Sequence, residues 1–176
     1  MLKKMFGLML VMALLIPVAG NAMDMTGKWG LGYFSSEAPV GVRYWINEKL
    51  GVDLGIGFES KDFGDETATS FWFEGGFPYV LMDTDRANFF VRPGLVFASL
   101  DDRVYGNNNL DETWTKITIK LTPGAEVFFG EHFSLQAAHG IMIDLTTPPD
   151  AVGDSKTEFN TGAYSISEIG FHFYFK

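Results

Sequence analysis

The sequence contains no cysteine, which excludes a disulfide framework and an anchor attached through cysteine. Beyond residue 22 it has no run of about 18 apolar residues, and this excludes membrane-spanning helices. Basic residues are scarce, because 13 Lys and Arg stand against 22 Asp and Glu, for a formal net charge of −9. Nucleic-acid phosphates require a basic surface, so we expect no nucleic-acid partner.

The chain begins with a pattern typical of a secretory signal. Lys3 and Lys4 precede the apolar run Met5–Val18, which is followed by small residues at the positions that a signal peptidase recognises. The run is shorter than the ~20 residues that a spanning helix needs. We therefore expect residues 1–22 to be a cleavable signal and residues 23–176 to form the mature domain. An uncleaved anchor is the alternative.

Alternation of apolar and polar side chains is the strongest pattern in the mature chain. Near its end, Ile169, Phe171, Phe173 and Phe175 alternate with small or polar residues, as in a strand with one face against lipid and the other toward a polar lumen. The pattern favours an all-β, eight-stranded antiparallel up-and-down transmembrane barrel. We predict strands at Lys28–Phe34, Val40–Ile46, Val52–Glu59, Thr67–Met82, Ala87–Leu100, Thr113–Phe129, Phe133–Leu145 and Asn160–Phe175.

Side-chain size decides which face of the predicted strands points outward. One face carries bulky apolar residues such as Leu54, Phe73 and Ile119, whereas the other carries glycine and charged residues. An eight-stranded barrel has an interior only wide enough for side chains to fill it. The apolar face must therefore point outward, where lipid is the solvent that tolerates it. A soluble, lipocalin-like barrel with its apolar face inside is the alternative.

The inward face carries nearly balanced charge. Buried charges persist only when they are paired, so we predict a salt-bridge network across the barrel in which the arginines are bidentate partners of carboxylates. Together with Trp45, Trp72 and Phe90, this network should plug the lumen. The residues that we expect to form the network are Arg43, Asp53, Glu74, Arg92, Lys120, Glu126, Asp144 and Glu168.

Short and long connections alternate along the chain. The longest are Asp101–Glu112 and Thr146–Phe159, and both are polar. Outer-membrane barrels have short periplasmic turns and longer external loops, so we expect these two loops outside the cell and both termini in the periplasm. Pro78, Pro93 and Pro123 lie within predicted strands and cannot donate to a ladder, and we predict bulges there.

Three segments combine glycine, charge and aromatic residues in a recurring way, namely Gly41–Trp45, Leu50–Phe58 and Pro123–Phe129. With them, essentially the whole mature chain resembles the small eight-stranded outer-membrane β-barrel proteins of the OmpA/OmpX type. The resemblance implies a location in the cell outer membrane and insertion by the barrel-assembly machinery. It also implies that the barrel contacts outer-membrane lipid and lipopolysaccharide.

The end of the chain is similar to the barrel-assembly signal of that family. The signal is a polar residue followed by x-Gly-x-x-aromatic-x-aromatic, and Glu168, Gly170, Phe173 and Phe175 occupy its positions. In the family an aromatic residue usually ends the chain, whereas here Lys176 follows it.

Some barrels of this size are lipid-modifying enzymes, so the histidines need separate consideration. His139 lies on the nominal lipid face, where an imidazole is costly unless it is hydrogen-bonded, and Ser165 or Ser167 on the next strand could partner it in hydrolysis. We favour a bulge that turns His139 inward. We expect His132 to be a solvated turn residue and His172 to join the lumen network. No catalytic residue and no enzymatic activity are therefore expected.

Fold alone does not select a partner. We expect a monomer with a structural or interaction role through its external loops, without a cofactor or a metal. A narrow conduit for ions or small solutes is the alternative. The acidic loops could also bridge lipopolysaccharide phosphates through a divalent cation, but their spacing matches no calcium loop, and simple solvated loops are favoured.

Overall fold

A computed structural model of the chain describes residues 24–64, 66–105, 112–149, 153–161 and 167–176. The predicted signal over residues 1–22 and Ser165 lie outside the described residues. The elements are β1 (Trp29–Tyr33), β2 (Val40–Trp45), β3 (Gly51–Asp62), β4 (Thr67–Gly76), β5 (Tyr79–Asp83), β6 (Ala87–Asp101), α2 (Asp102–Tyr105), β7 (Thr113–Phe128), β8 (Phe133–Ala138), β9 (Ile141–Thr147), β10 (Lys156–Asn160) and β11 (Glu168–Phe175). None of the described residues belongs to a helix that is both long enough and apolar enough to cross a membrane.

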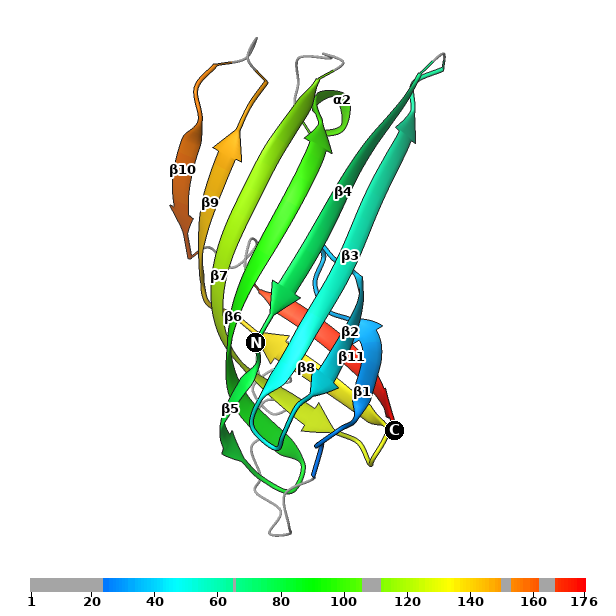
Figure 1. The fold of residues 1–176 in the computed structure, drawn as a ribbon, viewed down its shortest axis with the longest axis vertical. Helices are drawn as coiled ribbons and strands as arrows, with labels where there is room; N and C mark the ends of the chain where they lie inside the picture. The colour runs from blue at the N-terminus through cyan, green and yellow to red at the C-terminus, as the bar shows by residue number, and fades with distance from the viewer. Residues whose placement is uncertain (1–23, 65, 106–111, 150–152, 162–166) are drawn as a thin grey trace, which may run out of the picture.

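Eight strands close into an antiparallel barrel (Figure 1). The ring runs β1-β2-β3-β4-β6-β7-β8-β11, and β11 pairs again with β1. β5 continues β4 along β6, β9 continues β8 along β7, and β10 pairs with β9. This arrangement confirms the all-β, eight-stranded antiparallel up-and-down barrel that the sequence predicts.

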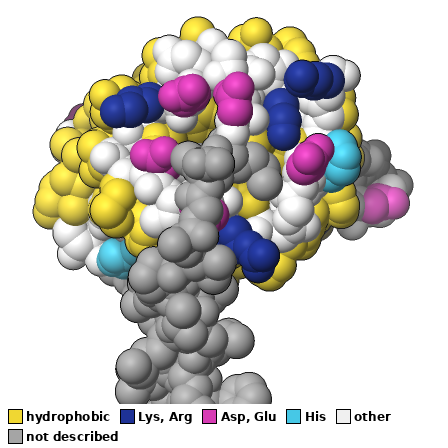
Figure 2. Space-filling model, turned by 90° about the horizontal axis from the view of Figure 1, so that it is seen from below, with side chains coloured by type: hydrophobic (Ala, Val, Ile, Leu, Met, Phe, Trp, Pro, Cys, Tyr) yellow, Lys and Arg dark blue, Asp and Glu magenta, His cyan; other side chains and the backbone are white. Residues whose placement is uncertain are grey.

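The lower end of the barrel in Figure 1 carries the short turns and both ends of the described chain. The Asn47 side-chain oxygen accepts hydrogen bonds at 2.9 Å from the backbone N–H groups two and three residues later. Gly130 has a φ of 93°, a conformation that other residues rarely adopt. Asp24 and Lys176 line one hollow here together with turn residues. Figure 2 views this end and shows charged side chains on it, with hydrophobic ones around the sides.

Side chains alternate between the two faces of the barrel wall. Along β7, Ile117, Ile119 and Leu121 point outward and are exposed, whereas Thr118 and Lys120 point inward and are buried. The bulky apolar residues therefore lie outside and the polar residues inside, as side-chain size predicts.

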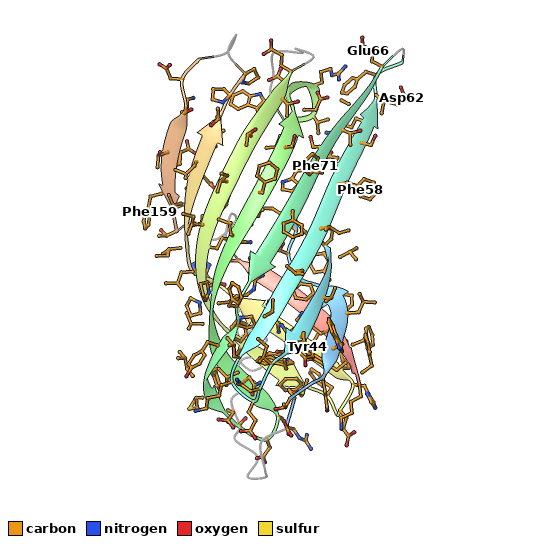
Figure 3. All side chains as sticks on the ribbon, in the orientation of Figure 1. Tyr44, Phe58, Asp62, Glu66, Phe71 and Phe159 are labelled. Carbon is orange, nitrogen blue, oxygen red and sulfur yellow. The ribbon has the colours of Figure 1, made fainter. Side chains whose placement is uncertain are left out.

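On the paired strands the outward apolar side chains end below the β3–β4 hairpin, with Phe58 and Phe71 lower than Asp62 and Glu66 in Figure 3, although Phe63 in the hairpin is also exposed. Phe58 of β3 is paired with Phe71 of β4, and the next outward pair toward the tip is Ser60 with Thr69. On the other long strands the next outward residue above the last large apolar one is also a hydroxyl residue: Ser99, Thr115 and Thr147. The outer surface is thus an apolar band beneath a polar rim.

The prolines affect the strands less than the sequence predicts. The predicted strand Thr67–Met82 is two strands separated at Pro78, and the register with β6 shifts at Leu81 instead. Pro93 and Pro123 lie in unbroken strands, and the β6–β7 register runs through both of them, so the bulges predicted there are wrong. Each residue of an antiparallel strand bonds to only one neighbouring strand, so one missing donor does not force a bulge.

The predicted strand Phe133–Leu145 is also two strands, with His139 between them. β8 and β9 pair with β7 in the same register on both sides of this break. His139 therefore keeps its outward position and is exposed, and the prediction that a bulge turns it inward is wrong. Part of the connection predicted at Thr146–Phe159 is instead strand, because it holds the top of β9 and most of β10.

Among the described residues, the barrel wall is complete only in its lower half. Pairing of β2 with β3 ends at Val40 and Ile56, so the stretch 57–62 of β3 pairs only with β4. Within the described part of the chain, β10 likewise pairs only with β9. In Figure 1 β10 is on the left and β3 on the right of the upper half, and the short β1–β2 hairpin lies lower, on the side of β3.

Candidate functional site in the barrel interior

Arg43 of β2 lies at the centre of the lower lumen and is fully buried. Its Nε and Nη2 donate to the two carboxylate oxygens of Asp53 at 2.7 and 2.9 Å. Its Nη1 donates to Glu126 at 2.9 Å, and its Nη2 also donates to Gln136 at 2.8 Å. The planar guanidinium thus binds Asp53 bidentately and joins strands from opposite parts of the ring.

Arg92 of β6 extends this cluster upward. Its Nε donates to Asp53 Oδ2 and its Nη1 to Glu74 Oε1, both at 2.7 Å. Asp53 therefore lies between two guanidinium groups. Gly76 provides the space, because a Cβ at that position would lie 2.5 Å from the guanidinium carbon of Arg92.

Lys120 connects the arginines to β11. Its Nζ lies 2.7 Å from Glu168 Oε1 and 3.1 Å from Glu74 Oε1. Of the eight residues predicted to form the network, the structure joins seven through these contacts. Asp144 lies apart from them, because it contacts Lys116 at 3.3 Å and accepts a hydrogen bond from Thr118.

Neutral polar residues complete the cluster around Glu126. Ser134 and Tyr174 donate to Glu126 Oε1 at 2.6 and 2.7 Å, and His172 Nδ1 lies 3.1 Å from the same oxygen. His172 was expected to lie here from the sequence, whereas Ser134, Tyr174 and Gln136 were not. Every oxygen of this buried carboxylate thus has partners, which is the condition for holding a charge away from water.

The connection between β1 and β2 folds into the barrel and covers the cluster. Ser35 is buried and donates to Glu74 at 2.9 Å, and its oxygen accepts a hydrogen bond from the backbone of Ala38. Glycine on β3 makes this possible, because a Cβ at Gly57 would lie 2.0 Å from the backbone oxygen of Glu37. The lumen is therefore occupied by ion pairs below and by this connection above.

The residues of the predicted assembly signal lie on both faces of β11. Glu168 and Gly170 point inward and are buried, and a Cβ at Gly170 would lie 2.5 Å from the backbone oxygen of Tyr33. Phe173 and Phe175 point outward and are exposed. In the folded barrel Glu168 forms an ion pair with Lys120, Gly170 is a packing position, and Phe173 and Phe175 belong to the apolar outer surface.

A second polar contact lies on the outer surface. His139 Nδ1 is 3.1 Å from Ser167 Oγ, and both side chains are exposed. Within the described residues no carboxylate bonds to this imidazole, so the geometry supplies a possible base and nucleophile without an orienting acid.

The upper end carries its own ion pairs, above the apolar band. Arg103 of α2 donates to Asp101 at 2.8 Å and to Glu66 at 2.5 Å, which ties the β6–β7 connection to the β3–β4 hairpin. The hydrogen bond from Arg103 lowers the pKa of the Asp101 carboxyl. The part of the chain that the structure describes contains no cluster of three or more His, Asp or Glu side chains suited to hold a metal ion.

Solved structures share this arrangement of strands. The N-terminal β-barrel domain of Pseudomonas aeruginosa OprF matches with a TM-score of 0.54 at 15% identity, over 87% of this chain and 100% of that chain. The chain has the fold of a small eight-stranded outer-membrane barrel.

A second similar structure is Ail, the attachment invasion locus protein of Yersinia pestis, with a TM-score of 0.39 at 13% identity over 86% of this chain and 100% of that chain. No protein-family model and no curated protein matches the chain. The similarity to solved structures thus concerns the outer-membrane-barrel fold and not a particular activity.

Proposed function

We propose that residues 23–176 form an integral barrel of the cell outer membrane, exported through a signal over residues 1–22. Both termini would lie in the periplasm, because the short turns and the two ends of the described chain are at the same end of the barrel. Insertion by the barrel-assembly machinery, and contact with outer-membrane lipid and lipopolysaccharide as a monomer, are parts of this proposal.

The observation that carries it is the apolar band. On β7 the outward residues from Ile117 to Val127 are apolar, and this stretch spans about 25 Å at the usual strand rise and tilt, the height of a membrane-barrel surface. A continuous exposed apolar surface of this height is unfavourable in water. The charged side chains of the lumen would be unfavourable if they faced lipid, and are stable only when they are paired inside the barrel. The observed distribution of side chains therefore suits a barrel whose outer surface is surrounded by lipid.

Spin labels test this orientation directly. Labels at Leu54 and Phe171, which point outward within the band, should be far more accessible to oxygen than to a water-soluble nickel chelate. A label at Asp62, above the band, should show the reverse. Higher nickel accessibility at the first two positions would refute membrane insertion.

The role that we propose is structural or interactive rather than transport. The ion pairs of Arg43 and Arg92 and the inward connection at Ser35–Pro39 favour a plugged lumen, so planar bilayers containing the protein should show no channel steps. Interaction would then depend on the external connections. Shortening the chain within 148–155 spares β10 and should weaken binding to cells or survival in serum without changing heat-modifiable migration on gels.

Hydrolysis of a lipid ester is a second candidate, favoured by the contact between His139 and Ser167 at the lipid-facing surface. It would need the His139 imidazole to remove the Ser167 proton as that oxygen attacks the acyl carbonyl, and to return the proton to the alcohol oxygen that departs as the ester C–O bond breaks. A water molecule, activated by the same imidazole, would then hydrolyse the acyl-serine, releasing the fatty acid and restoring the Ser167 hydroxyl. His139→Ala and Ser167→Ala should then abolish a change in lipid acylation that mass spectrometry detects with the unaltered protein. If the acyl chains are the same with and without the protein, this candidate fails.

A further inference from the structure

The upper lumen holds a cavity of about 440 Å³ beside the inward β1–β2 connection. Ser36 and Glu37 of that connection line it. Inward side chains of the wall also line it, namely Glu59 of β3, Trp72 of β4 and Lys116 of β7. Ser36 and Glu59 are exposed, so water reaches this space in the folded chain. We call it the upper cavity.

The polar groups of the upper cavity are suited to hydrogen-bond a ligand. The carboxylates of Glu37 and Glu59 accept, the Lys116 ammonium donates, and the Ser36 hydroxyl does both. Among the described residues no group donates a hydrogen bond to the Glu37 carboxylate, whose single ion-pair contact is Lys120 Nζ at 3.7 Å. The Glu37 side chain is 30% exposed, so its oxygens are available to a ligand.

The charges at the upper cavity are already compensated within the protein. Each charged side chain that lines it has an opposite charge close by. The pairs are Glu37 with Lys120 at 3.7 Å, Glu59 with Lys61 at 3.0 Å, and Lys116 with Asp144 at 3.3 Å. A cationic ligand would meet the ammonium of Lys116 and an anionic one the carboxylates of Glu37 and Glu59. The site therefore favours a ligand that is polar and uncharged.

Trp72 adds a flat apolar surface to these polar groups. Its strand partners are Gly57 on β3 and Ala98 on β6, so small residues lie on both sides of it. The indole is half-buried and lines the upper cavity. A purely hydrocarbon ligand would fit the indole but would leave Glu37, Glu59 and Lys116 without hydrogen-bond partners.

We propose that the upper cavity binds one neutral sugar ring. The C–H face of the ring packs against Trp72, and its hydroxyl groups bond to Glu37, Glu59 and Lys116. Because a hydroxyl both donates and accepts, neighbouring hydroxyls match a carboxylate and an ammonium at once. The volume lies within the range of about 300–1,000 Å³ that is usual for small-molecule sites.

The position of the upper cavity indicates where the sugar comes from. Phe58, which Figure 3 labels, borders the cavity and lies just below the polar outward pair of Ser60 and Thr69. In the membrane orientation proposed above, on which this step rests, that height is the outer surface. The sugar then belongs either to a lipopolysaccharide head group of the same membrane or to a free glycan outside the cell.

Saturation-transfer NMR with simple glycosides tests the site. The probes are methyl glucoside, methyl galactoside, methyl mannoside and methyl N-acetylglucosaminide, added at millimolar concentrations to the folded protein in phosphatidylcholine vesicles. At least one should show saturable transfer, strongest at the hydrogens of one ring face. No transfer to any of the four overturns the inference, as does binding of zwitterionic alanine in their place. Spin labels at Leu54 and Phe171 report membrane insertion separately.

Two matched pairs of variants locate the bound sugar. Glu37→Gln keeps the size of the side chain but removes its charge, and should weaken binding about tenfold. Asp62→Asn, on β3 but outside the cavity, should leave binding unchanged. Trp72→Leu should likewise weaken binding, whereas Trp29→Leu on the outer surface should not. Heat-modifiable migration on gels establishes that each variant is folded. Equal binding by all four variants would place the sugar elsewhere and overturn the inference.

Vesicles that also contain lipopolysaccharide distinguish the two sources. If a head-group sugar occupies the upper cavity, the added glycoside should bind at least about tenfold more weakly there than in phosphatidylcholine alone. Unchanged binding assigns the site to a glycan from outside. Either result supports a sugar site only where Glu37→Gln weakens binding in phosphatidylcholine vesicles.

Discussion

Asp53 lies between two guanidinium groups, and this makes each partner difficult to replace. Its carboxylate accepts hydrogen bonds from Arg43 and Arg92, and all three side chains are buried. Removing one member of such a group leaves an opposite charge buried without compensation. We predict that Arg43→Leu lowers the free energy of unfolding by about 3–5 kcal/mol, measured by urea titration of the protein folded in vesicles.

Lys61→Met is the matched control, because it also removes one cation from an ion pair. Lys61 contacts Glu59 at 3.0 Å, but both side chains are about half exposed, at 48% and 47%. Water screens such a pair, so the expected change in unfolding free energy is about 0–1 kcal/mol. If the two variants lose the same stability, the interior ion pairs are no more important to the fold than a surface pair.

The alternation of side chains along the strands predicted the charged members of the interior cluster and not the neutral ones. Arg43 and Asp53 are recognisable because a charge on one face of an alternating strand has to be paired. Ser134 and Gln136 carry no charge, and either would be equally acceptable in a turn or on a surface. Tyr174 is placed inward by its alternation with the outward Phe173 and Phe175, but its bulk is that expected of an outward residue, and its hydrogen bond to Glu126 was not predictable from the sequence.

The connection between β1 and β2 is the element that most separates the lumen from the upper end. In the sequence only its brevity distinguishes it. Its inward course depends on Gly57, whose missing side chain leaves room for the backbone of Glu37. We predict that Gly57→Val displaces this connection and its hydrogen bond from Ser35 to Glu74, and lowers the free energy of unfolding by about 1–3 kcal/mol, measured by urea titration of the protein folded in vesicles. Planar bilayers should stay silent, because the ion pairs of Arg43 and Arg92 still fill the lower lumen.

Gly75→Ala is the control for this prediction. Gly75 lies on β4 next to Gly76, but a Cβ there would meet only ordinary contacts, the nearest at 3.8 Å from Leu54. This variant should keep the unfolding free energy of the unaltered protein. An equal loss of stability in both variants would indicate general loosening of the barrel, and no loss in either would show that the connection does not depend on Gly57.

Breaks within strands were the elements that the sequence could not predict. β4 and β5, like β8 and β9, lie on either side of a two-residue interruption without losing register with their common neighbour. Alternation therefore continues across each interruption, and His139 stays outward. β10 could not be predicted for a different reason. Its residues Lys156, Thr157 and Glu158 are polar, as is typical of a loop.

At the scale of the whole molecule, the sequence predicted the barrel and the sidedness of its wall, because both follow from a period of two and from side-chain volume. It did not predict the open upper half of the wall. The wall formed by the described residues is open there because β1 and β2 are much shorter than β3, β4, β6 and β7. The predicted strands Lys28–Phe34 and Val40–Ile46 are already short, but which strands stand beside the space above them depends on pairing, which a local pattern does not contain.

The polarity of the surroundings can be tested on one strand with one kind of substitution. Leu121 and Thr115 both point outward from β7, the first within the apolar band and the second just above it. In a bilayer an arginine costs about 2–4 kcal/mol near the midplane and about 0–1 near the interface. We therefore predict that Leu121→Arg lowers the unfolding free energy in vesicles by the larger amount and Thr115→Arg by the smaller. On a barrel surrounded by water both changes would be nearly neutral, since each side chain is at least partly exposed. A difference of a few kcal/mol between two positions on the same face of one strand can come only from the depth of a lipid environment.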